Sequence, residues 1–315
     1  MSQNPFSQKV KIYTGSAIIL TVVAVLLRIL NFLLNFDTSI HYFYETPLHL
    51  IYRAVCILTV AWLLTSLIFI PRYSFPKATR PAVSNASRLT ALFCAVLTAG
   101  SFFFFRVNIY YYASHAKLYQ LLCLFSLLSA VYFFLQFLAN KPVQYTVLTS
   151  YTVILWIGLI LCVTYLNLYV AMNSPFKITL HMALLGFLLY LSEEARMLTD
   201  HSFRISYLAC TMIALLNCAL SSIPVLIAYA AGVYRDLDYL FYAVLTLGFL
   251  LYLCPRAYDC YRVLIVTPQA SPEEIAADKE KKRRDKEEKK NKKAKKQDSQ
   301  SAPTDQTKGD DTHVC

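Results

Sequence analysis

The first residues that could do chemistry form a polar stripe in an apolar stretch near the amino terminus. Thr14, Thr21, Arg28 and Asn35 recur every seven residues, and Asn31 follows Arg28 by three. Because an α-helix turns once in about 3.6 residues, this spacing places them along one helical face. An arginine on such a face offers a cation and a planar set of N–H donors to an anionic or strongly polar ligand. The stripe therefore predicts a polar binding pocket.

Two further apolar segments contribute residues to this predicted pocket. In the second apolar run, His49, Arg53 and Cys56 are spaced by four and three, which places them on one face near the end of a helix. His181 lies inside the sixth run. The predicted pocket is formed by Arg28, Asn31, Asn35, Arg53 and His181.

Structural roles are the alternative for the same side chains. Arg28 and Arg53 can extend to the outer membrane interface, or can pair with Asp37 and Glu45 in the first outer loop. A single histidine such as His181 is often hydrogen bonded within a packed core. Both interpretations stay open at this point.

Sequence motifs of catalysis are absent. The chain has no HExxH, no GxSxG, no glycine-rich phosphate loop and no pair of aspartates within an apolar run. Glu193 and Glu194 are adjacent, so on a helix they point about 100° apart, and we expect interfacial charges. The cysteines include no CxxC pair and predict free thiols that pack as small buried apolar side chains. We therefore expect no enzyme activity, no metal and no cofactor.

The composition indicates that these residues lie inside a membrane. Hydrophobic residues make up 57% of the 315 residues and charged residues only 16%, which is too apolar for a soluble domain. About 20 apolar residues are needed to cross the ~30 Å hydrocarbon core. Eight runs fit, at 14–36, 48–70, 88–106, 117–138, 146–170, 177–195, 206–231 and 238–256. The sixth and eighth are the shortest, so seven spans are the alternative.

The distribution of Lys and Arg among the loops predicts the orientation. The 37–47 and 171–176 loops have none. The 71–88 loop carries Arg72, Lys77, Arg80 and Arg88. Since basic loops stay cytoplasmic, we predict a cytoplasmic amino terminus at 1–13, a transmembrane bundle at 14–256 and a cytoplasmic carboxyl terminus. Two termini on one side require an even number of spans, which favours eight.

A charged tail follows the last apolar run. We predict a juxtamembrane segment at 257–270, a basic helix at 271–297 and a disordered end at 298–315. Ser271-Pro272-Glu273-Glu274 has the form of a helix start, with a cap, a first-turn proline and a capping-box glutamate. The net charge of +11 lies mostly in this tail, so it does not predict nucleic-acid binding.

Basic residues near a membrane attract anionic lipid by about 1 kcal/mol each. We expect contacts with anionic lipids of the inner leaflet from Arg72, Lys77, Arg80, Lys281, Lys282, Arg283 and Arg284. A protein partner for the carboxyl-terminal helix is the alternative to lipid.

The heptapeptide LGFLLYL occurs twice, at 185–191 and at 247–253. With eight spans, both copies run in the same direction and reach the same depth. A duplicated hairpin would give this pattern, and so would coincidence in two leucine-rich helices. Gly186 and Tyr190, four residues apart, predict a notch and its filler on one helical face.

These features predict an all-α polytopic membrane helix bundle of about eight transmembrane helices. We expect a non-enzymatic, sensor-like or scaffolding protein with an outward polar pocket around Arg28. The alternative is a secondary transporter of a small polar or anionic solute, and a third hypothesis is a lipid-modifying enzyme using Glu193 or His181. The scarcity of glycine, with 7 residues in the chain, counts against a transporter with broken helices.

The predicted orientation can be tested with single cysteines in a background that lacks the native ones. A membrane-impermeant maleimide added from outside should label Ile40→Cys in the 37–47 loop and should label Ala78→Cys only after permeabilisation. The opposite pattern would reverse the orientation.

Overall fold

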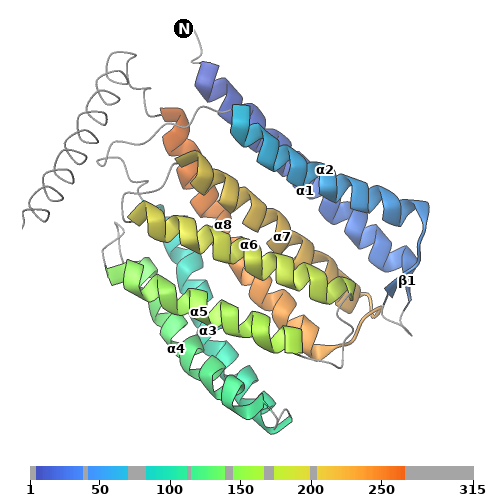
Figure 1. Cartoon of the computed structure of the whole chain (residues 1–315), viewed down its shortest axis with the longest axis vertical. Coiled ribbons are helices and arrows are strands. Elements are labelled where there is room, and N and C mark those ends of the chain that lie inside the picture. Colours follow the sequence, from blue (N-terminus) through green and yellow to red (C-terminus); the bar gives the residue numbers. More distant parts are fainter. Residues whose placement is uncertain are drawn as a thin grey trace, which may run out of the picture. The chain divides into compact units, whose positions relative to one another are not determined.

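Eight long helices lie side by side in the part of the chain that the computed structural model describes (Figure 1). That part comprises residues 5–37, 42–69, 83–111, 115–138, 145–166, 174–198 and 204–266. The helices are α1 (Pro5–Asn35), α2 (Pro47–Phe69), α3 (Asn85–Tyr111), α4 (Ala116–Leu138), α5 (Tyr145–Leu166), α6 (Pro175–Leu198), α7 (Arg204–Ala230) and α8 (Leu237–Val266).

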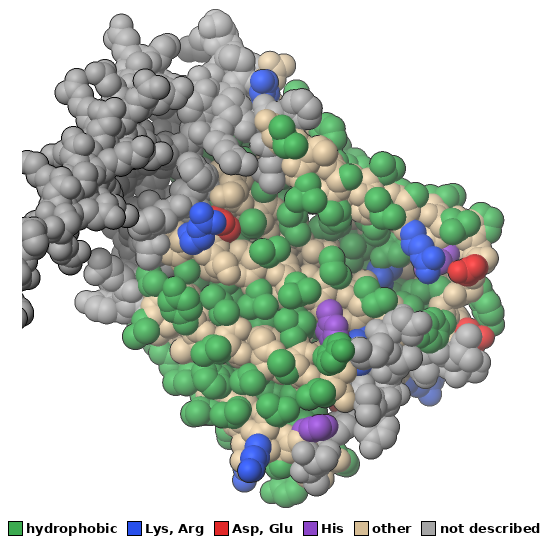
Figure 2. Space-filling view, viewed as in Figure 1, with side chains coloured by type: hydrophobic (Ala, Val, Ile, Leu, Met, Phe, Trp, Pro, Cys, Tyr) green, Lys and Arg blue, Asp and Glu red, His purple; other side chains and the backbone are tan. Residues whose placement is uncertain are grey.

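All eight helices are long and apolar enough to cross a membrane, and each corresponds to one predicted span. Apolar side chains are spread over much of the face seen in Figure 2. Among the described residues, large apolar side chains such as Ile68 and Phe103 are 80% and 70% exposed. Such a surface suits contact with lipid and not with water. The prediction of an all-α bundle with eight helices of spanning length is therefore confirmed.

The helix α1 begins at Pro5 instead of residue 14, and several other helix ends shift by a few residues. Two further details differ from the sequence prediction. A short antiparallel hairpin follows α1, with β1 (Phe36–Asp37) paired to β2 (Tyr42–Phe43). In addition, α8 continues through Pro255 to Val266, whereas the predicted span ends at residue 256. Packing explains the second difference, because side chains beyond 256, such as Asp259 and Cys260, are buried against the bundle.

Local capping explains where several helices begin. Thr46 accepts a hydrogen bond from the His49 amide at the start of α2, and Asp236 accepts from the Asp238 and Tyr239 amides at the start of α8. These side chains satisfy N–H groups that have no partner within the helix. Pro47 and Pro175 occupy first-turn positions in α2 and α6, where the missing N–H is not needed.

The helix α7 is the centre of the packing. It contacts α1, α2, α6 and α8. In its apolar 18-residue stretch, 67% of the residues are buried, more than in any other described helix. Its carboxyl end is closed by Gly232, which adopts a φ of 73° while the Val233 amide donates to the Ala228 carbonyl. A left-handed glycine at this position ends a helix without a steric penalty.

The repeated heptapeptides face each other across the α6–α8 interface. Phe187 and Phe249, which occupy equivalent positions in the two copies, stack with ring centroids 4.1 Å apart. Tyr190 and Tyr252, the next equivalent pair, lie 6.1 Å apart in an edge-to-face arrangement. The two parallel helices are therefore packed in register, at the same depth, as the sequence predicted.

Gly186 allows close approach of α6 to α7. A Cβ atom added there would lie 3.2 Å from the Ala214 Cα atom and 3.2 Å from the Asn217 amide nitrogen. The predicted filler, Tyr190, is fully buried and contacts Tyr207 on α7, with a hydrogen bond of 3.2 Å between the hydroxyls. The notch thus receives the α7 backbone, and Tyr190 packs one turn further along.

Replacing Gly186 should destabilise the bundle. In Gly186→Leu, the new side chain meets the α7 backbone, so α6 and α7 must separate, and we expect a loss of about 1–3 kcal/mol. Gly100→Leu is the matched control, because an added Cβ there has nothing within 4 Å. Thermal unfolding in a non-ionic detergent measures both; equal melting temperatures would contradict the close packing.

Candidate functional site

Arg28 lies at the centre of a polar cluster where α1, α2 and α6 meet. Its side chain is only 2% exposed. One terminal nitrogen donates to the Tyr52 hydroxyl at 2.7 Å. The other donates to the Thr179 hydroxyl at 2.9 Å and to the Pro175 carbonyl at 3.2 Å. We call Arg28, Tyr52, Thr179 and the Pro175 carbonyl the Arg28 cluster.

The Arg28 cluster carries an uncompensated positive charge. All hydrogen-bond acceptors of Arg28 are neutral, and no carboxylate contacts it among the described residues. Its Nε atom is buried without a partner. The chain segments 38–41, 112–114 and 167–173 contain no Asp or Glu. Asp37 is not among the partners of Arg28. It accepts a hydrogen bond from the Tyr44 hydroxyl, and this bond raises the pKa of Tyr44.

Aromatic rings complete the surroundings of this cation. The guanidinium carbon lies 5.3 Å from the Phe32 ring centroid and 5.7 Å from that of Tyr52. Ring faces stabilise a cation by about 0.5–2 kcal/mol, but they do not neutralise it. The site therefore retains a net positive charge in a region of low polarity.

Asn31 and Asn35 extend the predicted stripe along α1 from Arg28. Asn31 is fully buried and donates to the Leu27 carbonyl at 2.9 Å. Asn35 donates to the Asn31 side-chain oxygen at 3.1 Å. The stripe is thus a buried polar row, as its spacing indicated, although both asparagines bond within α1.

Arg53 and His181 are not brought to Arg28. Arg53 is exposed and makes no hydrogen bond or ion pair with the described residues. His181 is half-buried and its Nε2 atom lies 2.9 Å from the Thr164 hydroxyl of α5. A helical face places residues in a common direction, but the neighbouring helices decide which of them meet.

A groove adjoins the Arg28 cluster between α2, α6 and α7. Its volume is about 470 Å³, within the usual range of ~300–1,000 Å³ for small-molecule sites. Tyr52 and Thr179, the two side chains that bond Arg28, line it, together with Asn217 of α7. The remaining lining is mostly aliphatic.

An aromatic cluster covers the end of the bundle next to Arg28. Phe32 packs against Phe43 and Phe176, with ring centroids 4.9 and 5.1 Å apart. Tyr234, between α7 and α8, stacks on Phe176 at 4.2 Å. Burial raises the pKa of Tyr234, and the neighbouring Asp236 raises it further. The cluster fixes the hairpin and the first turn of α6 around the Arg28 site.

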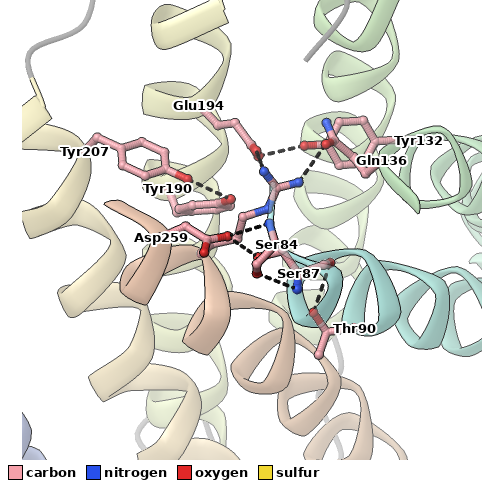
Figure 3. Close-up of polar contacts among 10 residues, drawn as sticks. Ser84, Ser87, Thr90, Tyr132, Gln136, Tyr190, Glu194, Tyr207 and Asp259 are labelled. Carbon is pink, nitrogen blue, oxygen red and sulfur yellow. Dashed lines mark hydrogen bonds and ion pairs between the residues drawn. The ribbon is translucent and has the colours of Figure 1, made fainter. Parts of the chain in front are cut away.

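A second polar cluster occupies the other end of α6 (Figure 3). Glu194 accepts a hydrogen bond from the Tyr132 hydroxyl at 2.7 Å and lies 3.8 Å from Arg256 of α8. Arg256 also donates to the Gln136 side chain at 2.7 Å. We call Glu194, Arg256, Tyr132 and Gln136 the Arg256 cluster.

The Arg256 cluster corrects the sequence prediction for the adjacent glutamates. Glu193 and Glu194 do point to different partners, since Glu193 bonds Arg196 and Ser206. Both are buried, however, with Glu193 8% and Glu194 2% exposed, and Glu194 is a buried ion-pair partner instead of an interfacial charge. The sequence signal that could have located it is its position three residues after the first heptapeptide, which matches the position of Arg256 after the second.

The carboxylate of Asp259, near the Arg256 cluster, accepts hydrogen bonds from the start of α3. The Asp259 side chain accepts from the Ser84 amide at 3.1 Å and from the Ser87 hydroxyl at 2.7 Å, and these contacts can be followed in Figure 3. Both donors lie at the amino-terminal end of α3, where the helix dipole favours a negative charge. Asp259 therefore connects α8 to α3.

The two arginine clusters differ in charge balance, which decides their roles. Arg256 has Glu194 as a counter-ion, so its cluster is neutral and joins α4, α6 and α8. Arg28 has neutral partners alone among the described residues, and a charge inside a membrane costs about 2.5–3.5 kcal/mol on insertion scales. Such a residue is a candidate for function. We therefore assign the candidate binding site to the Arg28 cluster.

Sequence reasoning missed several residues of these sites. Tyr52 and Thr179 resemble ordinary span residues, and their role depends on contacts between helices. Lys177 is also buried, and donates to the Tyr165 carbonyl near the end of α5, a favourable position for a cation.

The predicted contacts with anionic lipid stay a prediction, because their residues lie outside the described part of the chain. These residues are Arg72, Lys77, Arg80, Lys281, Lys282, Arg283 and Arg284.

Metal and disulfide chemistry has no site in the described part of the chain. No group of three or more His, Cys, Asp or Glu side chains is placed to hold a metal ion there. The eight described cysteines are free thiols. Cys162 and Cys254 are exposed on the bundle surface, contrary to the predicted burial; a thiol on a lipid-facing surface needs no burial in protein.

Comparison with known proteins gives no match to a protein-family model, a curated protein or a solved structure. The class of the protein therefore follows from its own fold. Eight apolar helices of spanning length define a multipass helical membrane protein.

Removing the Glu194 charge should destabilise the fold. Glu194→Gln leaves Arg256 buried without a counter-ion, and we expect a loss of about 3–5 kcal/mol. Glu193→Gln is the matched control; its ion-pair partner Arg196 is exposed, so we expect about 0–1 kcal/mol. Thermal unfolding in non-ionic detergent compares them, and equal effects would contradict the assigned role of Glu194.

Proposed function

We propose that this protein is a non-catalytic membrane bundle, with a sensor-like or scaffolding role, that binds an anionic group at the Arg28 cluster. The cluster then opens toward the outer side of the membrane, and both termini are cytoplasmic. Contacts of the basic loop and tail with anionic inner-leaflet lipid, or of the tail with a protein, belong to the same proposal.

One observation carries this proposal: Arg28 is a buried cation without a counter-ion among the described residues. A buried structural arginine is normally stabilised by a carboxylate, as Arg256 is by Glu194. At Arg28 this partner is missing, while one N–H group is free of any acceptor. A bound anion would supply both the charge and the acceptor.

The chemistry of the cluster favours binding over catalysis. Its side chains are an arginine, a tyrosine and a threonine. His49, three residues before Tyr52, has a buried Nδ1 atom without a partner and stacks on Phe43. No carboxylate is present to act as a general base or nucleophile in the described cluster. We therefore propose recognition without turnover.

Anion binding can be measured as ligand-dependent thermal stabilisation of the full-length protein in a non-ionic detergent. We expect decanoate or decyl phosphate to raise the melting temperature of the wild type by several degrees, because a ligand at about 100 times its Kd adds about 2.7 kcal/mol. Decyltrimethylammonium should have no such effect. In Arg28→Gln, the stabilisation by anions should disappear.

Arg53→Gln is the matched control, since Arg53 is an exposed arginine near the same end of α2 and lies outside the Arg28 cluster. It should retain the full anion effect. An anion effect that is equal in wild type and Arg28→Gln would refute the proposal. Anion flux into proteoliposomes that depends on Arg28 would instead support the alternative of a secondary transporter.

A further inference from the structure

The groove beside the Arg28 cluster has one polar end and one apolar end. At the polar end are the hydroxyls of Tyr52 and Thr179, both of which accept hydrogen bonds from Arg28. From there the groove follows α2 through Ile57 and Ala61 to Leu64. A site of this kind suits an amphiphile.

The dimensions of the groove fit one hydrocarbon chain. Tyr52 and Leu64 are separated by about 18 Å along the helix axis, at about 1.5 Å per residue. A volume of about 470 Å³ over that length leaves a cross-section of roughly 25 Å². This cross-section is enough for one alkyl chain beside α2.

The groove opens sideways, toward the space that lipid occupies. Its floor is formed by buried residues of α7, of which Leu216 is 1% and Leu220 is 6% exposed. Its rim is formed by Ile57 of α2, which is 69% exposed, and Met182 of α6, which is 45% exposed. An amphiphile dissolved in the bilayer can therefore enter between α2 and α6.

The polar end matches a small head group with one negative charge. Arg28 supplies one positive charge, and the Tyr52 hydroxyl, which accepts a hydrogen bond from Arg28, can donate its own proton to a ligand oxygen in the groove. A carboxylate has one charge and two oxygens. A phosphate monoester has up to two negative charges, whereas Arg28 supplies one positive charge, so we expect the carboxylate to bind more tightly.

From these features we infer that the protein binds a long-chain carboxylate, a free fatty acid of the bilayer. Its head group lies at the Tyr52 hydroxyl, which lines the groove and is hydrogen bonded to Arg28 behind it, and its chain lies in the groove along α2. The inference rests on the proposed anion site, and adds the chemical class of the ligand and its lateral route of entry.

Two native cysteines provide a direct test in the full-length wild-type protein. Cys56 lines the groove, whereas Cys162 is exposed on α5 outside it. Alkylation of both thiols by N-ethylmaleimide is followed by mass spectrometry in a non-ionic detergent, with and without hexadecanoate. At about ten times its Kd, hexadecanoate should slow alkylation of Cys56 about tenfold, because only ligand-free molecules react. Cys162 should react at an unchanged rate.

Two pairs of variants separate the head-group contact from the chain contact. Arg28→Gln should abolish the protection of Cys56, and Arg53→Gln should retain it. Ala61→Trp fills the groove and should also prevent protection, whereas Leu58→Trp, at a 63% exposed position of α2 outside the groove, should not. Because positions 58 and 61 are both exposed on α2, this pair tests the chain site even if Arg28→Gln fails to fold.

The outcomes distinguish this inference from the proposed function. If acetate protects Cys56 as well as hexadecanoate does, and Arg28→Gln abolishes the effect, the anion site stands and the chain site is refuted. If hexadecanol or hexadecyltrimethylammonium protects as well as hexadecanoate, the groove binds a chain regardless of its charge, and the inference of a carboxylate ligand is refuted, whereas the anion site is decided by the melting experiment with Arg28→Gln. Protection by hexadecyl phosphate alone would overturn the choice of a carboxylate.

Discussion

The low polarity of the membrane interior is the constraint on which this structure depends, because every charge placed there needs a partner. The helix α6 provides partners for buried charges at both of its ends. Thr179 and the Pro175 carbonyl hold Arg28 at the first turn, and Glu194 holds Arg256 near the last. About 22 Å of helix separates Thr179 from Glu194, so one element organises two distant polar clusters.

These clusters connect different parts of the bundle. The Arg256 cluster joins α4, α6 and α8 through groups that neutralise one another, and such a network favours a single packed arrangement. The Arg28 cluster joins the α1–α2 pair to α6 through neutral acceptors, which leaves a charge uncompensated. The first arrangement is complete within the protein, whereas the second is completed by a ligand in the function we propose.

The heptapeptide repeat illustrates how a short sequence pattern becomes a three-dimensional contact. Two helices separated by one antiparallel neighbour run in the same direction, so equivalent residues can lie at equal depth. Phe187 meets Phe249, Tyr190 meets Tyr252, and the next equivalent pair is the ion pair of Glu194 and Arg256. The repeat is therefore a packing surface between α6 and α8, continued by a charged contact three residues beyond it.

The amino-acid sequence by itself determined the number and approximate limits of the helices, since long apolar runs allow no other spanning structure in lipid. It also determined that Arg28, Asn31 and Asn35 share one face, because helical periodicity is local. Tertiary structure alone decided that Tyr52 and Thr179 surround Arg28, that Arg53 and His181 lie apart from it, and that Glu194 is buried. Those outcomes depend on how helices distant in sequence pack against each other, and the spacing of residues within one helix carries no information about its neighbours.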